Sequence, residues 1–384
     1  MNTKVHLEDG PLTLSGKGQA YATPGPAFTS RVAYAAAHVV ADPAAENTPG
    51  APPVLDWEAT LAFRRHLWSH GFGVAEAMDT AQRGMGLDYP AARELVRRSA
   101  REAVAVGGSI VAGVATDQLP PGPATLDEIR KAYAEQLADV QEAGAVPVLM
   151  CSRQLAAAAR SAKDYLDVYG QLIDESGGPV VLHWLGPAFD PLLAGYWGHD
   201  DPTRAADTVV DLIAAHPRKV DGIKLSLLDE GFEVALRRRL PAGVRLYTGD
   251  DFNYPVLIRG DDQGHSEALL GVFAAIAPPA AAALRALDVG DLDTYDRILA
   301  PTVPLARHLF RAPTYYYKTG IVFLAWLAGH QDHFTMVAGV QSGRSPRHLG
   351  ELLRLADAAG LLPDAELAAH RARAWLTTVG VAQP

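Results

Sequence analysis

The sequence predicts an α/β fold, namely a (β/α)8 TIM barrel with an N-terminal β-hairpin and a C-terminal helical extension. Short apolar runs that are nearly continuous in Val, Ile, Leu and Ala are typical of strands buried on both faces of a parallel sheet. Segments of helical period separate most of these runs, and alternating strands and helices favour a parallel sheet, which eight repeats close into a barrel. The eight expected strands are residues 31–40, 72–78, 109–115, 145–151, 179–185, 220–226, 244–248 and 267–276.

Amphipathic segments mark the expected helices, although those of the last two barrel repeats are poorly marked. Within the barrel they are residues 57–69, 91–106, 126–142, 155–175 and 204–216. The tail adds helices at 295–309, 317–328, 346–359 and 364–377, which exceed the needs of a minimal barrel. We therefore divide the chain into a hairpin and lead-in (1–30), a barrel (31–290) and a helical extension packed on it (291–384).

The expected hairpin rests on alternation at the N-terminus. Val5 and Leu7 alternate with polar residues, Asp9-Gly10 marks a turn, and the alternation resumes afterwards. An Asp-Gly pair between alternating runs is a strong hairpin signal. The Pro-rich polar segment 42–54 is expected to be an exposed loop after the first barrel strand.

Composition bounds the class of protein. The 384 residues carry a formal net charge of −10 with acidic and basic residues interspersed, which argues against a nucleic-acid surface. Cys151 is the one cysteine, so no intramolecular disulfide forms, as suits a reducing compartment. The N-terminus lacks an apolar signal core, and no membrane span is expected. We expect a cytoplasmic protein that binds a small-molecule substrate, with no nucleic-acid or membrane partner.

Lys224 is the main catalytic candidate. Alternation in the sixth run places Ile223 and Leu225 on one face and Gly222 and Lys224 on the other, which would point into the barrel. Desolvation there lowers a lysine pKa and yields a neutral amine that can attack a carbonyl and form an imine. The alternative is a lysine paired with a barrel carboxylate such as Asp250.

His183 lies late in the fifth run, on the same face as Val181, and is the candidate general acid/base. The alternative is a core histidine with a satisfied hydrogen bond. Cys151 is interpreted as a packing residue, and the cluster 315–318 (Tyr-Tyr-Tyr-Lys) as packing or an interface. The stretch 83–86 (Arg-Gly-Met-Gly) is too short for a phosphate fingerprint.

Acidic residues at strand ends are the candidate substrate ligands, because active sites of parallel barrels form there. Turn or capping roles are the alternative, since Asp is a preferred N-cap residue. The candidates are Glu76, Asp79, Asp117, Asp250 and Asp251. No cofactor is expected; the alternative is a divalent metal held by His183, Glu76, Asp250 and His265.

These motifs resemble those of the dihydrodipicolinate synthase / N-acetylneuraminate lyase family, as a divergent branch. Residues 222–224 (Gly-Ile-Lys) resemble the family's Schiff-base element, and 247–251 (Tyr-Thr-Gly-Asp-Asp) its Ser-Gly-Asp-Asp element. Residues 182–187 resemble its Leu-Tyr-Asn-x-Pro element, and 110–114 its Val-Ile-Ala-Gly strand. The resemblance spans about residue 30 to the end and implies a TIM barrel, a Schiff-base lysine at Lys224 and a homodimer or homotetramer.

The sequence differs from the family's motifs at positions that bear on which substrate is bound. The family's catalytic tyrosine aligns with His183, and its Gly-Thr-Thr-Gly-Glu loop aligns with residues 73–79, which lack the hydroxyl pair. Three functions follow. The first is a Schiff-base lyase or aldolase of a keto sugar or keto acid. The second is a metal-dependent lyase, isomerase or epimerase of a sugar-like substrate, and the third a ligand-binding barrel without activity.

Overall fold

A closed parallel barrel forms the centre of the protein, as the sequence predicts. The computed structural model describes residues 3–18, 21 and 24–384; residues 1–2, 19–20 and 22–23, within the expected lead-in, lie outside the described residues. Eight strands of this described part pair in the order β10-β3-β4-β5-β6-β7-β8-β9. They are β3 (Ala33–Ala36), β4 (Gly73–Glu76), β5 (Ile110–Val114), β6 (Val146–Leu149), β7 (Val180–Leu185), β8 (Val220–Ser226), β9 (Arg245–Thr248) and β10 (Glu267–Leu270).

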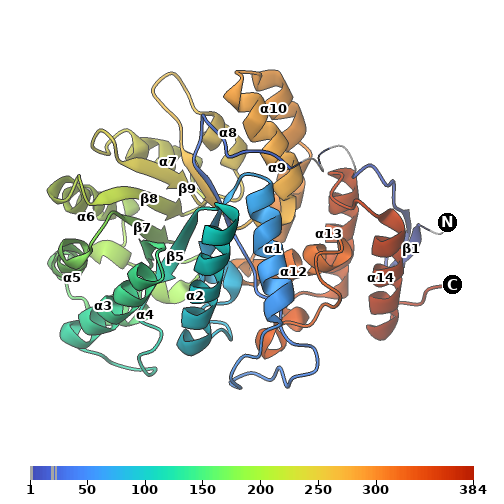
Figure 1. The fold of residues 1–384 in the computed structure, drawn as a ribbon, viewed down its shortest axis with the longest axis horizontal. Helices are drawn as coiled ribbons and strands as arrows, with labels where there is room; N and C mark the ends of the chain where they lie inside the picture. Colours follow the sequence, from blue (N-terminus) through green and yellow to red (C-terminus); the bar gives the residue numbers. More distant parts are fainter. Residues whose placement is uncertain (1–2, 19–20, 22–23) are drawn as a thin grey trace.

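Helices cover the outer face of the barrel (Figure 1). The main ones are α1 (Trp57–Ser69), α2 (Tyr89–Val106), α3 (Leu126–Glu142), α4 (Arg153–Ala158), α5 (Ala162–Glu175), α6 (Pro202–Ala215), α7 (Glu230–Arg237), α8 (Tyr254–Arg259) and α9 (Phe273–Asp288). Short 3-10 turns include η1 (Asp79–Ala81), η2 (Pro191–Leu193) and η3 (Tyr196–Gly198).

Helix ends follow local capping chemistry. The bounds of α1 and α3 agree with the expected 57–69 and 126–142, since Asp56 caps α1 and a Thr125–Glu128 capping box opens α3. The expected helix 155–175 is instead two helices, because the chain is extended at Ala159 and restarts at Ser161. The expected eighth strand ends at Leu270, and α9 already begins at Phe273, within the same run.

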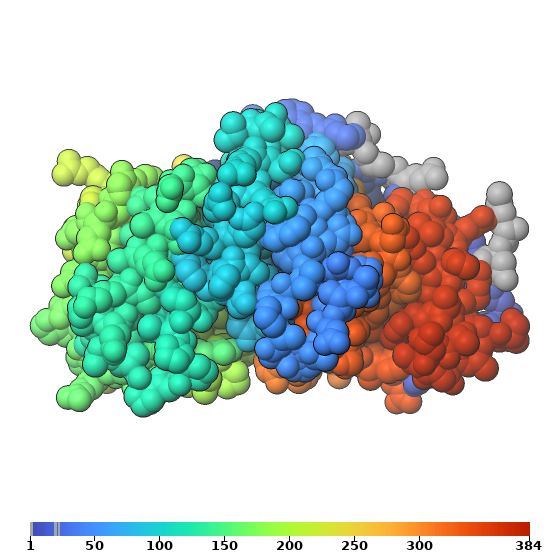
Figure 2. Space-filling view, turned by 60° about the horizontal axis from the view of Figure 1, so that its bottom comes forward, coloured from blue at the N-terminus to red at the C-terminus, as the bar shows by residue number. Residues whose placement is uncertain are grey.

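The C-terminal extension consists of α10 (Leu292–Leu299), α11 (Thr302–Leu309), η4 (Thr314–Tyr316), α12 (Tyr317–Leu327), η5 (Val337–Gly343), α13 (Pro346–Ala358) and α14 (Ala365–Thr378). The expected helix 295–309 is interrupted at Pro301, which has no N–H to continue α10. Figures 1 and 2 show α13 and α14 (orange-red to red) toward one end of the elongated molecule and the middle barrel repeats (teal to green) at the other, and Figure 1 shows α12 nearer the middle.

The hairpin packs on this extension rather than on the barrel. It consists of β1 (Lys4–Leu7) and β2 (Gly10–Thr13), and Leu7 pairs with Gly10. The turn is therefore Glu8-Asp9, one residue earlier than expected, because Gly10 adopts φ 133° and already belongs to the second strand. The two ends of the chain meet where the backbone of His6 exchanges hydrogen bonds with the Gln383 amide at 2.7 and 3.0 Å.

Residues alternate between the inside of the barrel and the helix layer. The interior cluster takes one side chain or two from most strands, and the side chains between them join the larger core beneath the helices. Its members are Ala36, Ala75, Met78, Val111, Ala115, Val148, Met150, Val181, Tyr247 and Leu269. Ile223 and Leu225 belong to the outer core, so Lys224 faces inward as expected. In the described residues, no helix is long and apolar enough to cross a membrane.

Candidate active site

Lys224 lies inside the barrel near the C-terminal end of β8. In the sheet register it stands between His183 of β7 and Tyr247 of β9. The residue is only 7% exposed, and within the described part of the chain its Nζ has no hydrogen bond or ion-pair partner within 4 Å. Burial lowers the pKa of the amine, while the charges of Asp79 and Asp251 act in the opposite direction. A buried lysine without a direct partner is unusual and points to a function.

The absence of a side chain at Gly249 provides the space that the Lys224 side chain occupies. A Cβ at this glycine would lie 2.9 Å from Lys224 Cε and 2.2 Å from Ser226 Oγ. Both distances are below van der Waals contact, so any other residue here would displace the lysine. The glycine of the motif 247–251 is thus required by the close approach of the amine-bearing side chain.

The two acids that follow Gly249 have different partners. Asp250 accepts hydrogen bonds from the backbone N–H groups of Phe252 and Asn253 at 2.8 and 3.0 Å, so it caps the turn into α8. Asp251 accepts one from Val272 N–H at 2.8 Å, and burial raises its pKa to about 7 despite that bond and the Lys224 charge. Asp251 is therefore the acid of this pair that interacts with Lys224.

Asp79 is the second acid that faces Lys224. It begins η1, directly after a turn in which Ala77 adopts the left-handed conformation at φ 50°. Its charge acts on Lys224, and also on Tyr317 and Lys318 of the C-terminal extension. Asp79 thus lies at the mouth of the barrel, where the sequence places a substrate ligand.

His183 lies at the level of Lys224 but is completely buried. Its Nε2 is 3.3 Å from Ser226 Oγ, and its Nδ1 has no partner within the described residues. Burial, and then the charge of Lys224, hold the pKa of His183 well below its usual value. A neutral imidazole can accept a proton or a hydrogen bond, but it cannot act as an imidazolium acid near neutral pH.

Two residues that the sequence analysis interpreted as packing, Tyr317 and Lys318, also lie at the mouth. Tyr317 stacks on Phe310 at 4.3 Å and is 2.8 Å from Thr80 Oγ1 through its hydroxyl. A Cβ at Gly271, just after β10, would lie 3.1 Å from the Tyr317 and Phe310 rings. Helix α12 therefore begins over the strand ends, a placement that no local pattern in the sequence could indicate.

Glu76 does not reach the mouth. Both of its oxygens accept hydrogen bonds from Arg64 of α1 at 2.8 Å, and Ser99 of α2 donates to one of them at 2.5 Å. Because Ala75 faces the barrel interior, Glu76 faces the helix layer. The substrate-binding role that we expected for Glu76 is not compatible with this position.

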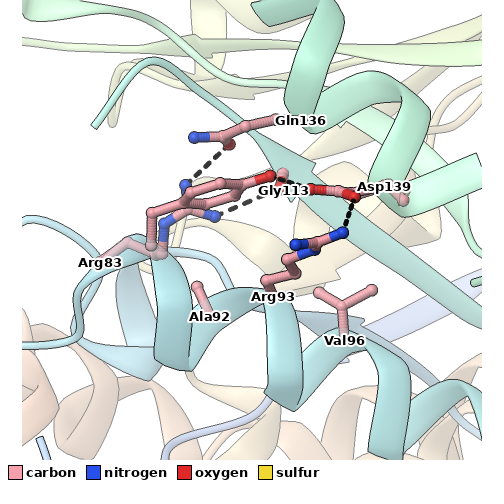
Figure 3. Close-up of a pocket in the computed structure, with 9 residues that line it drawn as sticks. Arg83, Ala92, Arg93, Val96, Gly113, Gln136 and Asp139 are labelled. Carbon is pink, nitrogen blue, oxygen red and sulfur yellow. Dashed lines mark hydrogen bonds and ion pairs between the residues drawn. The ribbon is translucent and has the colours of Figure 1, made fainter. Parts of the chain in front are cut away.

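Asp117 is also engaged in the wall of the barrel. Burial by itself would raise the pKa of Asp117, but the charge of Arg83 and the hydrogen bonds from Arg83 and Gln136 together lower it. Gln136 donates a further hydrogen bond to Asp117 at 2.8 Å. Figure 3 shows Arg83 pointing toward Gln136 and the Gly113 carbonyl in a crevice between α2 and α3. Asp117 is thus placed to hold Arg83 rather than a substrate.

The four alternative metal ligands do not come together. His265 lies 3.5 Å from Glu267 at the beginning of β10, so it is at the opposite end of the barrel from Asp250. Glu76 faces the helix layer and Asp250 caps a turn. Across residues 3–18, 21 and 24–384, no group of three or more His, Cys, Asp or Glu side chains could hold a metal ion.

Solved structures share this fold. A dihydrodipicolinate synthase from Aquifex aeolicus aligns with 86% of this chain and 99% of its own, at TM-score 0.64 and 13% identity. A dihydrodipicolinate synthase from Thermotoga maritima aligns with 87% of this chain and 100% of its own, at TM-score 0.63 and 15% identity. A prophage protein of the dihydrodipicolinic acid synthase family from E. coli K12, solved in complex with pyruvate, aligns with 86% of this chain and 99% of its own, at TM-score 0.62 and 16% identity. The predicted resemblance is thereby confirmed at the level of the fold.

At the level of sequence, no curated protein matches significantly. Residues 8–381 match the family described as "Protein of unknown function (DUF993)". Because this match covers nearly the whole chain, the protein belongs to that family.

Proposed function

We propose that this member of the DUF993 family is a Schiff-base lyase or aldolase in which Lys224 attacks the carbonyl of a keto acid or keto sugar. The observation that carries the proposal is the position of Lys224, buried at the strand ends with a lowered pKa and without a direct partner in the described chain. The structures that share the fold are of dihydrodipicolinate synthase-type proteins, one of them in complex with pyruvate, which supports the same chemistry.

The first step requires a neutral amine and a proton acceptor. Asp251, whose pKa burial raises to about 7, is suited to take the proton from the Lys224 ammonium. The amine nitrogen then bonds to the carbonyl carbon, and the C=O electron pair moves to oxygen, which takes up the proton that the nitrogen releases. Loss of that oxygen as water leaves an iminium, and Asp251 in its protonated form can supply the second proton.

The second step uses the iminium as an electron sink. For a substrate with a hydroxyl on its β-carbon, a carboxylate of the site takes the hydroxyl proton, and that oxygen forms the C=O of the departing carbonyl fragment. The electron pair of the Cα–Cβ bond flows toward nitrogen as the bond breaks. The remaining enamine takes up a proton, and water releases the product. In this proposal Asp79 orients a substrate hydroxyl at the mouth, and neutral His183 with Ser226 orients groups deeper inside the barrel; the charge of Asp79 on Lys224 and the 3.3 Å contact of His183 with Ser226 support these roles.

Borohydride trapping with peptide mass spectrometry tests the proposal. The purified protein is incubated with a panel of keto acids and keto sugars, reduced, and digested. We expect a mass adduct on the peptide that contains Lys224, and no adduct in Lys224→Met. An adduct confined to exposed lysines such as Lys163, or turnover that survives in Lys224→Met, would refute Schiff-base catalysis at this residue.

A further inference from the structure

Lys318 is a second buried lysine at the barrel mouth. It is the second residue of α12, is only 3% exposed, and donates to Met85 Sδ at 3.2 Å. Among the residues that the structure describes, this thioether is the only hydrogen-bond partner of the ammonium. The ring of Tyr317 lies 5.3 Å from the Lys318 Nζ, but a ring face and a weak thioether acceptor leave the other N–H donors without a hydrogen-bond acceptor in this buried part of the described structure.

Arg153, the first residue of α4, brings a second cation to the same place. Its side chain is 49% exposed; its Nε donates to Asp190 Oδ2 at 2.6 Å, and its two Nη groups, which make no hydrogen bond within the described chain, are open to an incoming anion. The guanidinium lies 3.7–3.9 Å from the position that a Cβ of Gly84 would occupy. Since Met85 follows Gly84 directly, Arg153 and Lys318 flank the same two residues of the loop after β4.

This loop is held in one conformation by the extension. Gly84 and Gly86 have φ of 72° and 119°, and a Cβ at Gly86 would lie 2.8 Å from Ala338 Cβ. The Gln82 amide donates to Met85 O at 3.1 Å and to Val337 O at 3.0 Å. The contacts of residues 337–338 therefore fix the loop that Arg153 and Lys318 share.

Asp79 relates this pair of cations to Lys224. Its charge acts on both lysines, so both lie within electrostatic range of one carboxylate. A carbonyl compound that is bound at Lys224 and extends past Asp79 would approach Lys318. The carboxylate of Asp79 favours a hydroxyl near the carbonyl and disfavours an anionic group there, whereas the unused donors of Lys318 and Arg153 favour an anion farther along.

We infer that Lys318 and Arg153 bind an anionic group, a phosphate or a carboxylate, at the end of the substrate remote from its carbonyl. The inference rests on the proposed function, because it assumes that the carbonyl carbon is held at Lys224. It narrows the substrate class to ketones that carry a phosphate ester or a carboxylate several bonds from the carbonyl. Neutral ketones of the same skeleton would be poor substrates.

The charge state of Lys318 gives the preference a pH dependence. Burial lowers the pKa of Lys318 to about 8, with Asp79 and Asp190 raising it and Arg153 lowering it. Lys318 is therefore cationic below about pH 8 and loses its charge above that value. The preference for an anionic ligand is expected below pH 8 and decreases as the pH rises through it.

The test uses matched pairs of ketones in the borohydride trapping of Lys224. One pair is 4-oxopentanoate and 2-pentanone, and the other is D-fructose 6-phosphate and D-fructose. We expect half-maximal labelling by one anionic member at a concentration at least about tenfold lower than by its neutral partner, as charge-assisted hydrogen bonds would give. The pair that shows the preference identifies the anion as carboxylate or phosphate.

Variants assign the preference to residues. Lys318→Met and Arg153→Gln should each reduce it at least about fivefold, while Lys163→Met, an exposed control on α5, should leave it unchanged. Thermal unfolding checks that Lys318→Met remains folded. Equal labelling by both members of each pair, or a preference that survives in Lys318→Met, would overturn the inference and leave the proposed function standing.

Calorimetry distinguishes a failure of the proposed function at Lys224 from a failure of the anion site at Lys318. If no ketone labels Lys224, the proposed function fails, and inorganic phosphate and 4-oxopentanoate are then titrated into the full chain. Binding that is lost in Lys318→Met would support the anion site by itself. Absence of binding by both anions, or binding unchanged in Lys318→Met, would overturn it.

Discussion

Two buried charged sites on neighbouring parts of the barrel differ in how their polar atoms are satisfied. In the helix layer, Arg64 and Glu76 form a bidentate ion pair that Ser99 and a backbone N–H complete. Inside the barrel, Lys224 is buried with acids that act on it only from a distance, within the described residues. A complete set of partners is typical of a structural site, whereas unmet donors at strand ends indicate a site that binds or reacts.

The largest expected effect comes from the incomplete site. Lys224→Met should reduce turnover, or the rate of imine trapping, by roughly 10⁴-fold or more, because it removes the nucleophile. Its free energy of unfolding should not fall, since the change removes a buried charge without a direct partner. Peptide mass spectrometry measures the rate of trapping, and denaturant unfolding measures the free energy of unfolding. A large loss of stability would show that Lys224 has a structural role instead.

The complete site should respond in the opposite way. Glu76→Gln leaves Arg64 buried without its carboxylate and should lower the free energy of unfolding by roughly 3–5 kcal/mol. In the protein that remains folded, trapping at Lys224 should be retained. Denaturant unfolding and trapping of the same preparation check both points. A stable Glu76→Gln protein with no trapping would return Glu76 to the active site.

Asp251 tests the acid/base part of the account. Asp251→Asn should slow imine formation by about 10²-fold, a typical contribution of a general acid or base. In the wild type, trapping should increase as the pH rises through about 7, because only the carboxylate form of Asp251 accepts the Lys224 proton. The variant should lack this limb of the pH profile, and a profile identical to that of the wild type would exclude Asp251 as the acceptor.

The same residue predicts a pH dependence of stability. The folded-state pKa of Asp251 is raised from 3.8 to about 7, so its contribution is fully present below about pH 4 and is lost as the pH rises toward 7. Asp251→Asn should therefore become relatively more stable than the wild type across this interval. Thermal unfolding of both proteins at several pH values measures the difference, which should be absent below pH 4.

Gly249→Ala should lower stability moderately and slow the reaction. The new Cβ would overlap Lys224 Cε and Ser226 Oγ, and overpacking of this kind costs about 1–3 kcal/mol. Because the lysine must move, trapping should slow while the protein stays folded. Asp250→Ala is the matched comparison, since it removes a turn cap without touching the amine. Equal trapping by wild type and Gly249→Ala would show that the lysine position is not critical.

The sequence predicted the barrel because its signals are local. Buried strands are read from short apolar runs, and the ends of α1 and α3 follow from Asp56 and the Thr125–Glu128 capping box. Lys224 was found in the same way, through alternation within β8. These inferences needed no knowledge of which segments meet in space.

The remaining part of the site depends on tertiary contacts. Alternation alone left both faces of β4 possible for Glu76, and only its contact with Arg64 decides between them. Tyr317 and Lys318 come from an extension more than 80 residues beyond β8, and their position over the strand ends is set by the packing of α12. The roles of Asp250 and Asp251 separate only when their hydrogen-bond partners are known.

The ionisation of Lys224 tests the central claim most directly, namely that this amine is held ready to react. Reductive methylation with ¹³C-formaldehyde gives each lysine an NMR signal that moves as the amine loses its proton, and Lys224→Met assigns the relevant one. We predict that the Lys224 signal titrates at a lower pH than that of exposed Lys163 in the folded protein, and that the two signals titrate together once denaturant unfolds the barrel. A Lys224 signal that titrates together with Lys163 in the folded protein would contradict the account.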